Sequence, residues 1–166
     1  MNAKRLFFIL ISCGIVYFIC DKHLIPKFKG SYLDYSMTDL NQKPIKFDVY
    51  KEKYILVDVY ATWCSDCLKS ISGLKKIREI VVKEGWELVA ISNDDTEKTK
   101  EFIARKKISY PCWHLIPNYK TLGIYNIPTY FVLDPTGKVI YSTSSPINWE
   151  HDSSLAMLRK LKSDHE

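Results

Sequence analysis

The sequence predicts an α/β protein with a mixed central β-sheet and helices on both faces of that sheet. Two observations lead to this class. Apolar runs typical of buried strands alternate with segments in which apolar residues recur every three or four positions, so the expected order is β-β-α-β-α-β-β-α. In addition, only a short turn separates the last two strands, which should therefore be antiparallel, whereas connections through helices favour parallel strands.

The first half of this order leads to an amphipathic helix. Residues 39–44 predict a turn, and residues 45–47 predict a short strand. Residues 55–60 are mostly apolar and β-branched, as in a central buried strand. After a loop, apolar positions spaced three and four apart between residues 68 and 81 predict a helix that Gly85 should end.

The second half contains the remaining strands and helices. Asn93 and Asp94 should begin the next helix, and Asp-Pro-Thr-Gly at residues 134–137 gives a tight turn. The same patterns predict strands over residues 86–91, 130–133 and 139–141, and helices over residues 96–106 and 153–162. Residues 113–116 are a candidate for a further short strand that this order does not count.

Composition excludes several classes of protein. Apolar residues make up 46% of the 166 residues, which is enough for a core and excludes intrinsic disorder. Five cysteines are too few for a disulfide-dense small protein. The net charge of +5 is spread along the chain without a basic block, so no nucleic-acid partner is expected. Nucleotide-binding and nucleophile-elbow motifs are missing, so no cofactor is expected.

The N-terminal residues 1–26 predict a signal or membrane anchor, followed by one domain over residues 27–166. Lys4 and Arg5 precede the uncharged, apolar residues 6–20, a pattern typical of export signals. The charge order places the domain on the extracytoplasmic, periplasmic side. A helix of 15 residues spans about 22 Å, which is short for a bilayer core of about 30 Å.

Three other interpretations of this segment remain open. Leu-Ile-Ser before Cys13 resembles a lipoprotein signal, which would make Cys13 a lipidation site. The segment could instead be cleaved, which would leave a soluble exported domain. A helix buried within the domain is a third interpretation, although Asp21 and Pro26 separate it from the rest.

The motif Trp63-Cys64-Ser65-Asp66-Cys67 lies between a predicted strand and a predicted helix. Cys64 then falls at the start of the helix, where free N–H groups and the helix dipole stabilise a thiolate. Cys67 follows one turn later and can form a disulfide with Cys64. Cys64 is therefore the expected attacking, more exposed thiol, and Cys67 the more buried, resolving thiol.

Three separated segments, YATWCSDC, IPTYFVLD and PTGKVIY, together resemble the thioredoxin superfamily. Within it they are similar to the membrane-tethered, extracytoplasmic TlpA/ResA-like thiol-disulfide oxidoreductases, over residues 39–162. The resemblance implies a thioredoxin-like fold with Cys64 as nucleophile and Cys67 as resolving cysteine.

The resemblance also implies a substrate-binding loop. Pro128, between Ile127 and Thr129, would be a cis-proline that faces the dithiol, and the backbone of Ile127 would pair with a substrate strand. Trp63 would flank the site as an apolar lip. The partners implied are a disulfide-containing protein substrate and a dithiol electron donor, for which a membrane thiol transporter is a candidate.

Two acidic residues bear on the chemistry. Asp58 lies six residues before Cys64 in a strand that looks buried, so its carboxyl should have a raised pKa and could exchange a proton with Cys67. A solvated or merely hydrogen-bonded Asp58 is the alternative, and residues 86–91 offer no lysine as a basic partner. Asp66 places a negative charge near the thiolate, which favours a reductant over a strong oxidant.

Other functions compete with this interpretation. Cys64 and Cys67 could form a zinc site with Cys112 and His114, although Cys112 has apolar neighbours typical of a buried, inert cysteine. A peroxiredoxin-type peroxidase would share the fold, but its Pro-x-x-x-Thr-x-x-Cys pattern is missing. A non-catalytic binding module is the third alternative. Candidate substrates are apocytochrome c thiols, exported proteins with wrong disulfides, and small disulfides.

Overall fold

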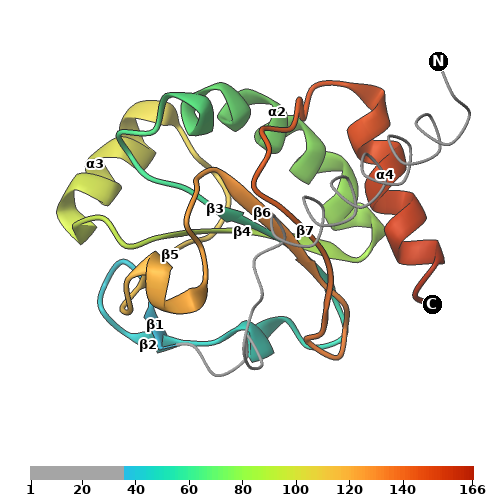
Figure 1. Cartoon of the computed structure of the whole chain (residues 1–166), viewed down its shortest axis with the longest axis horizontal. Coiled ribbons are helices and arrows are strands. Elements are labelled where there is room, and N and C mark those ends of the chain that lie inside the picture. Colours follow the sequence, from blue (N-terminus) through green and yellow to red (C-terminus); the bar gives the residue numbers. More distant parts are fainter. Residues whose placement is uncertain (1–35) are drawn as a thin grey trace, which may run out of the picture.

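The computed structural model describes residues 36–166, without the side chains of residues 121 and 122 (Figure 1). The predicted anchor over residues 6–20 and the lipidation candidate Cys13 lie outside this part of the chain. Within residues 36–166, no helix combines the length and apolar character needed to cross a membrane.

Seven strands form one mixed sheet in the order β2-β1-β5-β4-β3-β6-β7. Neighbours β3 and β4 are parallel, as are β4 and β5, and the other neighbouring pairs are antiparallel. The predicted mixed sheet is therefore confirmed. The strands are β1 (Met37–Thr38), β2 (Pro44–Ile45), β3 (Tyr54–Val59), β4 (Trp86–Ser92), β5 (Cys112–Leu115), β6 (Thr129–Leu133) and β7 (Val139–Thr143).

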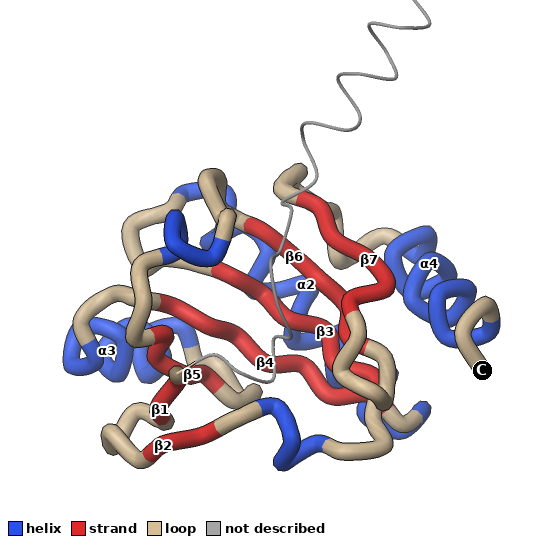
Figure 2. Tube along the Cα trace, turned by 60° about the horizontal axis from the view of Figure 1, so that its bottom comes forward, coloured by secondary structure: helices blue, strands red, loops and turns tan. Residues whose placement is uncertain are grey.

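Helices cover both faces of the sheet, as expected, but the two faces differ. Leu74, Phe102 and Leu158, one from each α-helix, pack in the same core cluster, so all three α-helices lie on one face (Figures 1 and 2). The other face is covered by short 3-10 helices and loops. The helices are α2 (Ser65–Val81), α3 (Thr96–Lys106) and α4 (Asp152–Ser163), with the 3-10 helices η2 (Phe47–Tyr50), η3 (Val82–Glu84) and η4 (Tyr119–Leu122).

The direction of the chain across the sheet explains this asymmetry. The connections β3-α2-β4 and β4-α3-β5 both move the chain the same way across the sheet. Because such crossovers between parallel strands are right-handed, both helices are placed on the same face. The return from β5 to β6 runs through η4, and Ile124 after it packs in the opposite core cluster with Phe47 of η2.

Two local predictions were wrong, and one short strand was not predicted. The strand expected at residues 45–47 is only Pro44–Ile45, because Phe47 begins η2 and packs its buried ring 5.0 Å from Trp113. β2 pairs with β1, a strand that the sequence did not predict. Asn93 and Asp94 do not begin α3. Asp95 caps it instead, accepting hydrogen bonds from the backbone N–H groups of residues 97 and 98.

Two glycines lie at positions where a side chain would be unfavourable. Gly85 ends η3, the continuation of α2, with a positive φ of 84° that favours glycine. Gly73 lies in the middle of α2, where a Cβ atom would come within 2.7 Å of the Trp149 backbone. The close approach of residues 146–150 to α2 therefore depends on the missing side chain.

Candidate active site

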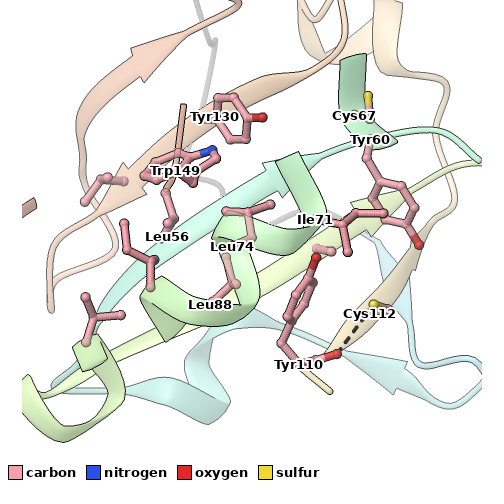
Figure 3. Packing of buried hydrophobic residues seen from close by; sticks show 14 of the residues in the cluster. Leu56, Tyr60, Cys67, Ile71, Leu74, Leu88, Tyr110, Cys112, Tyr130 and Trp149 are labelled. Atoms are coloured by element: carbon pink, nitrogen blue, oxygen red, sulfur yellow. Dashed lines mark hydrogen bonds between the residues drawn. The ribbon is translucent and has the colours of Figure 1, made fainter. Parts of the chain in front are cut away.

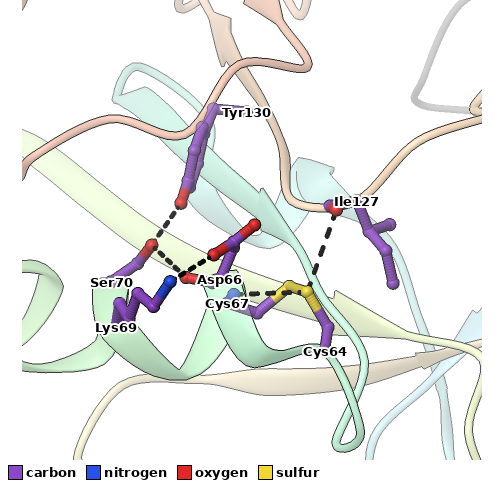
Figure 4. A network of polar contacts seen from close by, with 7 residues as sticks. All are labelled: Cys64, Asp66, Cys67, Lys69, Ser70, Ile127 and Tyr130. Carbon is purple, nitrogen blue, oxygen red and sulfur yellow. Dashed lines mark hydrogen bonds and ion pairs between the residues drawn. A yellow bond between two sulfur atoms is a disulfide. The ribbon is translucent and has the colours of Figure 1, made fainter.

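Cys64 and Cys67 form a disulfide at the start of α2, with Cα atoms 5.3 Å apart (Figure 4). Cys64 is the N-cap residue, and its Sγ accepts a hydrogen bond of 3.2 Å from the backbone N–H of Cys67. The side chain of Cys64 is 7% exposed and that of Cys67 is 2% exposed. Cys64 is thus the more accessible sulfur, although both are largely covered.

A loop from another part of the chain faces the disulfide. The Ile127–Pro128 peptide bond is cis, as the resemblance implied, and the carbonyl oxygen of Ile127 lies 3.8 Å from the Sγ of Cys64. Buried Thr129 fixes this loop, because its hydroxyl donates a 2.6 Å hydrogen bond to the carbonyl of Asn126 and contacts the Ser144 hydroxyl at 2.9 Å. The predicted loop residues are therefore brought together with Cys64.

Asp58 lies in the row of the sheet that runs Tyr130–Asp58–Ala90–Cys112 across β6, β3, β4 and β5. Strand alternation points its side chain to the face covered by α2, the same face as Leu56. The residue is only 3% exposed, which excludes a solvated carboxylate. Desolvation raises its pKa from 3.8 to about 7, and its Oδ1 has no hydrogen-bond partner among the described residues.

Tyrosines and Cys112 surround this acid. Figure 3 shows Cys112 near the side chains of Tyr60 and Tyr110, and its thiol donates to the carbonyl oxygen of Tyr110 at 3.5 Å. Burial, followed by the charge of Asp58, raises the pKa of the Cys112 thiol to about 12. Burial is also the main cause that raises the pKa of Tyr130 to about 12. The raised pKa favours the protonated thiol of Cys112 at neutral pH.

The zinc alternative requires Cys112 and His114 to join the dithiol. The Nδ1 of His114 instead lies 3.1 Å from the backbone carbonyl of Asp94. No group of three or more metal-ligating side chains is present within residues 36–166.

The acidic residue inside the motif has a cationic neighbour. Asp66 forms an exposed ion pair of 2.7 Å with Lys69, one turn further along α2. Ser70 lies one turn after Asp66, and its hydroxyl donates a 3.2 Å hydrogen bond to the backbone carbonyl of Asp66. The same hydroxyl shares a 2.7 Å hydrogen bond with the hydroxyl of Tyr130 (Figure 4). The first turns of α2 are thereby linked to β6, directly after the cis-proline.

Sequence reasoning missed Asp94. Its Oδ2 accepts a 2.6 Å hydrogen bond from the backbone N–H of Thr62, and its Oδ1 accepts one of 3.2 Å from the indole Nε1 of Trp63. The signal that could have found it is topological. The carboxyl ends of neighbouring parallel strands meet at one edge of a sheet, so an acid just after β4 lies beside the loop just after β3.

Tyr119 of η4 supports the same loop from the opposite face, and it was also missed. Its hydroxyl donates a 2.6 Å hydrogen bond to the carbonyl of Tyr60 and accepts one of 2.8 Å from the backbone N–H of Asn93. The segments that follow β3 and β4 are therefore tied together just before the dithiol. Nothing in the local sequence of residues 119–122 indicates this contact.

Known proteins similar to this chain support the same interpretation. The profile of the AhpC/TSA family matches residues 24–142. The chain belongs to this family. A curated relative, the thiol-disulfide oxidoreductase ResA of Bacillus thuringiensis subsp. konkukian (strain 97-27), is 28% identical over 155 residues, which cover 84% of this chain and 88% of the relative.

Solved structures show the fold. A Chlorobium tepidum protein assigned as thiol:disulfide interchange protein DsbE matches with a TM-score of 0.69 at 18% identity, covering 81% of this chain and 98% of that one. A thiol-disulfide oxidoreductase of Bacteroides fragilis NCTC 9343 gives 0.66 at 20% identity, covering 80% and 99%. The predicted thioredoxin-like fold is confirmed. The ResA relatives and the Cys64–Cys67 disulfide confirm the predicted class of enzyme, a thiol-disulfide oxidoreductase.

Proposed function

We propose that the protein is a disulfide reductant that acts on exported proteins through a mixed disulfide at Cys64. The Cys64 thiolate attacks one sulfur of the substrate disulfide, and the other substrate sulfur leaves as a thiolate and takes up a proton. Cys67 then loses its proton and attacks Cys64, which releases the second substrate sulfur and closes the Cys64–Cys67 disulfide. The substrate gains two electrons, and the dithiol loses two.

The position of the Cys64 sulfur carries this proposal. It caps α2, where free backbone N–H groups and the helix dipole stabilise a thiolate. It also lies 3.8 Å from the carbonyl of Ile127, on the loop with the cis bond to Pro128. A substrate segment that pairs with the backbone of Ile127 would bring its disulfide to Cys64, with Trp63 as an apolar wall and Thr129 holding the loop.

Asp58 is the proposed acceptor for the proton that Cys67 loses. Its burial and its pKa of about 7 suit a carboxyl that takes up and returns a proton near neutral pH. Cys67 is the more buried cysteine of the pair and lies on the helix that covers this face of the sheet. Cys112, with its raised pKa, takes no part in the exchange.

The direction of the reaction follows from charge. The Asp66 carboxylate lies in the first turn of α2, beside the cysteine that must become a thiolate, and its exposed pair with Lys69 offsets this charge only in part. A less stable thiolate makes the dithiol a better reductant. A redox titration in glutathione buffers should therefore give a potential well below about −120 mV, the value of a strong oxidant, and a value near it would contradict the proposed direction.

The proposal places the domain on the periplasmic side of a membrane, tethered by residues 6–20 or lipidated at Cys13, with a cleaved, soluble form as the alternative. A dithiol protein there must re-reduce the Cys64–Cys67 disulfide, and a membrane thiol transporter is the candidate donor.

Trapping of the mixed disulfide tests the function. In a Cys67→Ser variant the resolving thiol is missing, so substrates should accumulate as covalent adducts of Cys64 that dithiothreitol releases. The matched control is Cys64→Ser, which should trap nothing through Cys67. Mass spectrometry of the released partners would identify the substrate class.

Other outcomes favour the alternatives. If Cys67→Ser traps no partner and the wild type reduces neither insulin nor small disulfides, the binding-module interpretation gains support. Rapid consumption of peroxide that disappears in Cys64→Ser would favour the peroxidase.

A further inference from the structure

The loop before the dithiol exposes a large apolar side chain to solvent. Trp63 is 72% exposed and directly precedes Cys64. Tyr125, 73% exposed, lies two residues before Ile127, whose carbonyl faces the Cys64 sulfur. Two exposed aromatic side chains therefore lie on the two segments that meet at this sulfur.

Asp94 holds one of these two rings. Its carboxylate uses one oxygen for the backbone N–H of Thr62 and the other for the indole N–H of Trp63, at 2.6 and 3.2 Å. Both bonds involve a charged acceptor and are of the stronger kind. An exposed tryptophan can sample several rotamers, and the hydrogen bond from its indole N–H to Asp94 favours one of them.

Asp94 is itself held from two sides. Its backbone N–H donates to the buried hydroxyl of Ser92 at 3.1 Å, and its carbonyl contacts the Nδ1 of His114 at 3.1 Å. It does not cap α3, since Asp95 does so. Its carboxylate therefore has no role in the helix and is directed to the active-site loop.

We propose that Asp94 is a positioning residue that pre-orients the Trp63 ring for protein substrates and thereby favours protein disulfides over small disulfides. This inference rests on the proposed reductase function. A protein substrate is large enough to cover the ring while its disulfide reaches Cys64, whereas a small disulfide contacts the sulfur alone. Immobilising one flexible side chain during binding costs about two- to tenfold in affinity, which a fixed ring avoids.

The test compares two disulfide substrates, insulin and bis(2-hydroxyethyl) disulfide, in turnover with dithiothreitol, which reduces the Cys64–Cys67 disulfide again after each cycle; the rate without protein is subtracted. Asp94→Asn keeps the size of the side chain but replaces one acceptor oxygen by an NH₂ group that faces an N–H donor. It should raise KM for insulin by about fivefold with kcat nearly unchanged, and leave the rate with the small disulfide within about twofold. Trp63→Phe keeps the carboxylate and removes only the indole N–H, so it should raise KM for insulin in the same way.

Iodide quenching reports the ring directly, because Trp63 is the exposed tryptophan and the other three are buried. The Trp63 emission of oxidised Asp94→Asn should show lower anisotropy and altered quenching. The matched control is Asp134→Asn, which removes a similar acceptor of two backbone N–H groups at the opposite end of β6. It should change neither KM nor quenching.

Two results would overturn the inference. Equal losses with insulin and with the small disulfide would mean that Asp94 acts on the dithiol itself. An unchanged KM for insulin in both Asp94→Asn and Trp63→Phe would mean that the fixed ring does not contribute to recognition. Failure of the reductase function is distinguishable, because the wild type would then reduce neither substrate.

Discussion

Replacement of Asp58 by asparagine should remove a large pH dependence from the stability of the oxidised protein. Asp58 is buried, and desolvation raises its pKa from 3.8 to about 7 in the folded state. Between these values the carboxyl ionises in the unfolded chain while the folded protein keeps its proton. The unfolded state therefore gains relative stability as the pH rises from about 4 to about 7, and the folded protein becomes less stable.

The size of the effect follows from the difference between the two pKa values. From 3.8 to about 7 is a difference of about three pH units, and each unit corresponds to about 1.4 kcal/mol, which gives a loss of about 4 kcal/mol above pH 7. The penalty is absent below about pH 4, where both states are protonated. An asparagine does not ionise, so Asp58→Asn should not lose this stability as the pH rises.

Urea unfolding of the oxidised wild type and variant between pH 4 and pH 8 measures this difference. The free energy of unfolding of Asp58→Asn, minus that of the wild type, should increase by about 4 kcal/mol across the range. Other titrating groups cancel in the subtraction. Asp48→Asn, the same substitution at an exposed position, is the matched control. A difference for Asp58→Asn that stays constant within about 1 kcal/mol would refute the burial argument.

Four further predictions address other parts of the structure. Asp58→Asn should slow the release of insulin from the mixed disulfide at pH 7 by at least tenfold, measured in single turnovers, and an unchanged rate would exclude Asp58 as proton acceptor. Cys112→Ala should keep insulin reduction within about twofold and lose about 1–2 kcal/mol of stability in urea, whereas loss of activity with an intact fold would give this thiol a redox role. Gly73→Ala would gain about 1 kcal/mol in an isolated helix, but here it should lower stability by about 1–3 kcal/mol, since the new Cβ meets the Trp149 backbone; a stabilised variant would contradict that contact. The purified, reduced protein should hold no stoichiometric zinc by metal analysis, and one bound zinc per chain would revive the zinc site.

Much of the fold was predictable because local patterns determine it. Continuous apolar runs placed the long strands, and helical spacing of apolar residues placed the three α-helices, within a few residues. The dithiol was predictable for the same reason, since a strand end, a short loop and a helix start suffice to place Cys64 and Cys67. Strands β1 and β2 are only two residues long, which is too short for any spacing to show. Their place in the sheet depends on tertiary pairing instead, since β1 pairs with β5 and β2 pairs with β1.

The contacts that support the site depend on which strands are neighbours. Asp94 and Asp95 are adjacent acids in the sequence, yet one binds the loop before Cys64 and the other caps α3. Local preference treats both as helix-capping residues, and only the parallel pairing of β3 with β4 separates them. Tyr119 is a stronger case, because its contact with the Tyr60 carbonyl crosses from the opposite face of the sheet.

The environment of Asp58 was predictable from the sequence only in part. The sequence already showed that residues 86–91 contain no lysine. The strand register adds that Ala90 of β4 lies beside Asp58, and that Cys112 of β5 lies beside Ala90. On the other side, Tyr130 is the cross-strand neighbour. Thiol and hydroxyl groups can hydrogen-bond a carboxylate, but unlike an ammonium group they do not neutralise it. Desolvation therefore acts without an opposing cation, which is why the pKa of this acid rises to about 7, within the range where the dithiol must exchange its proton.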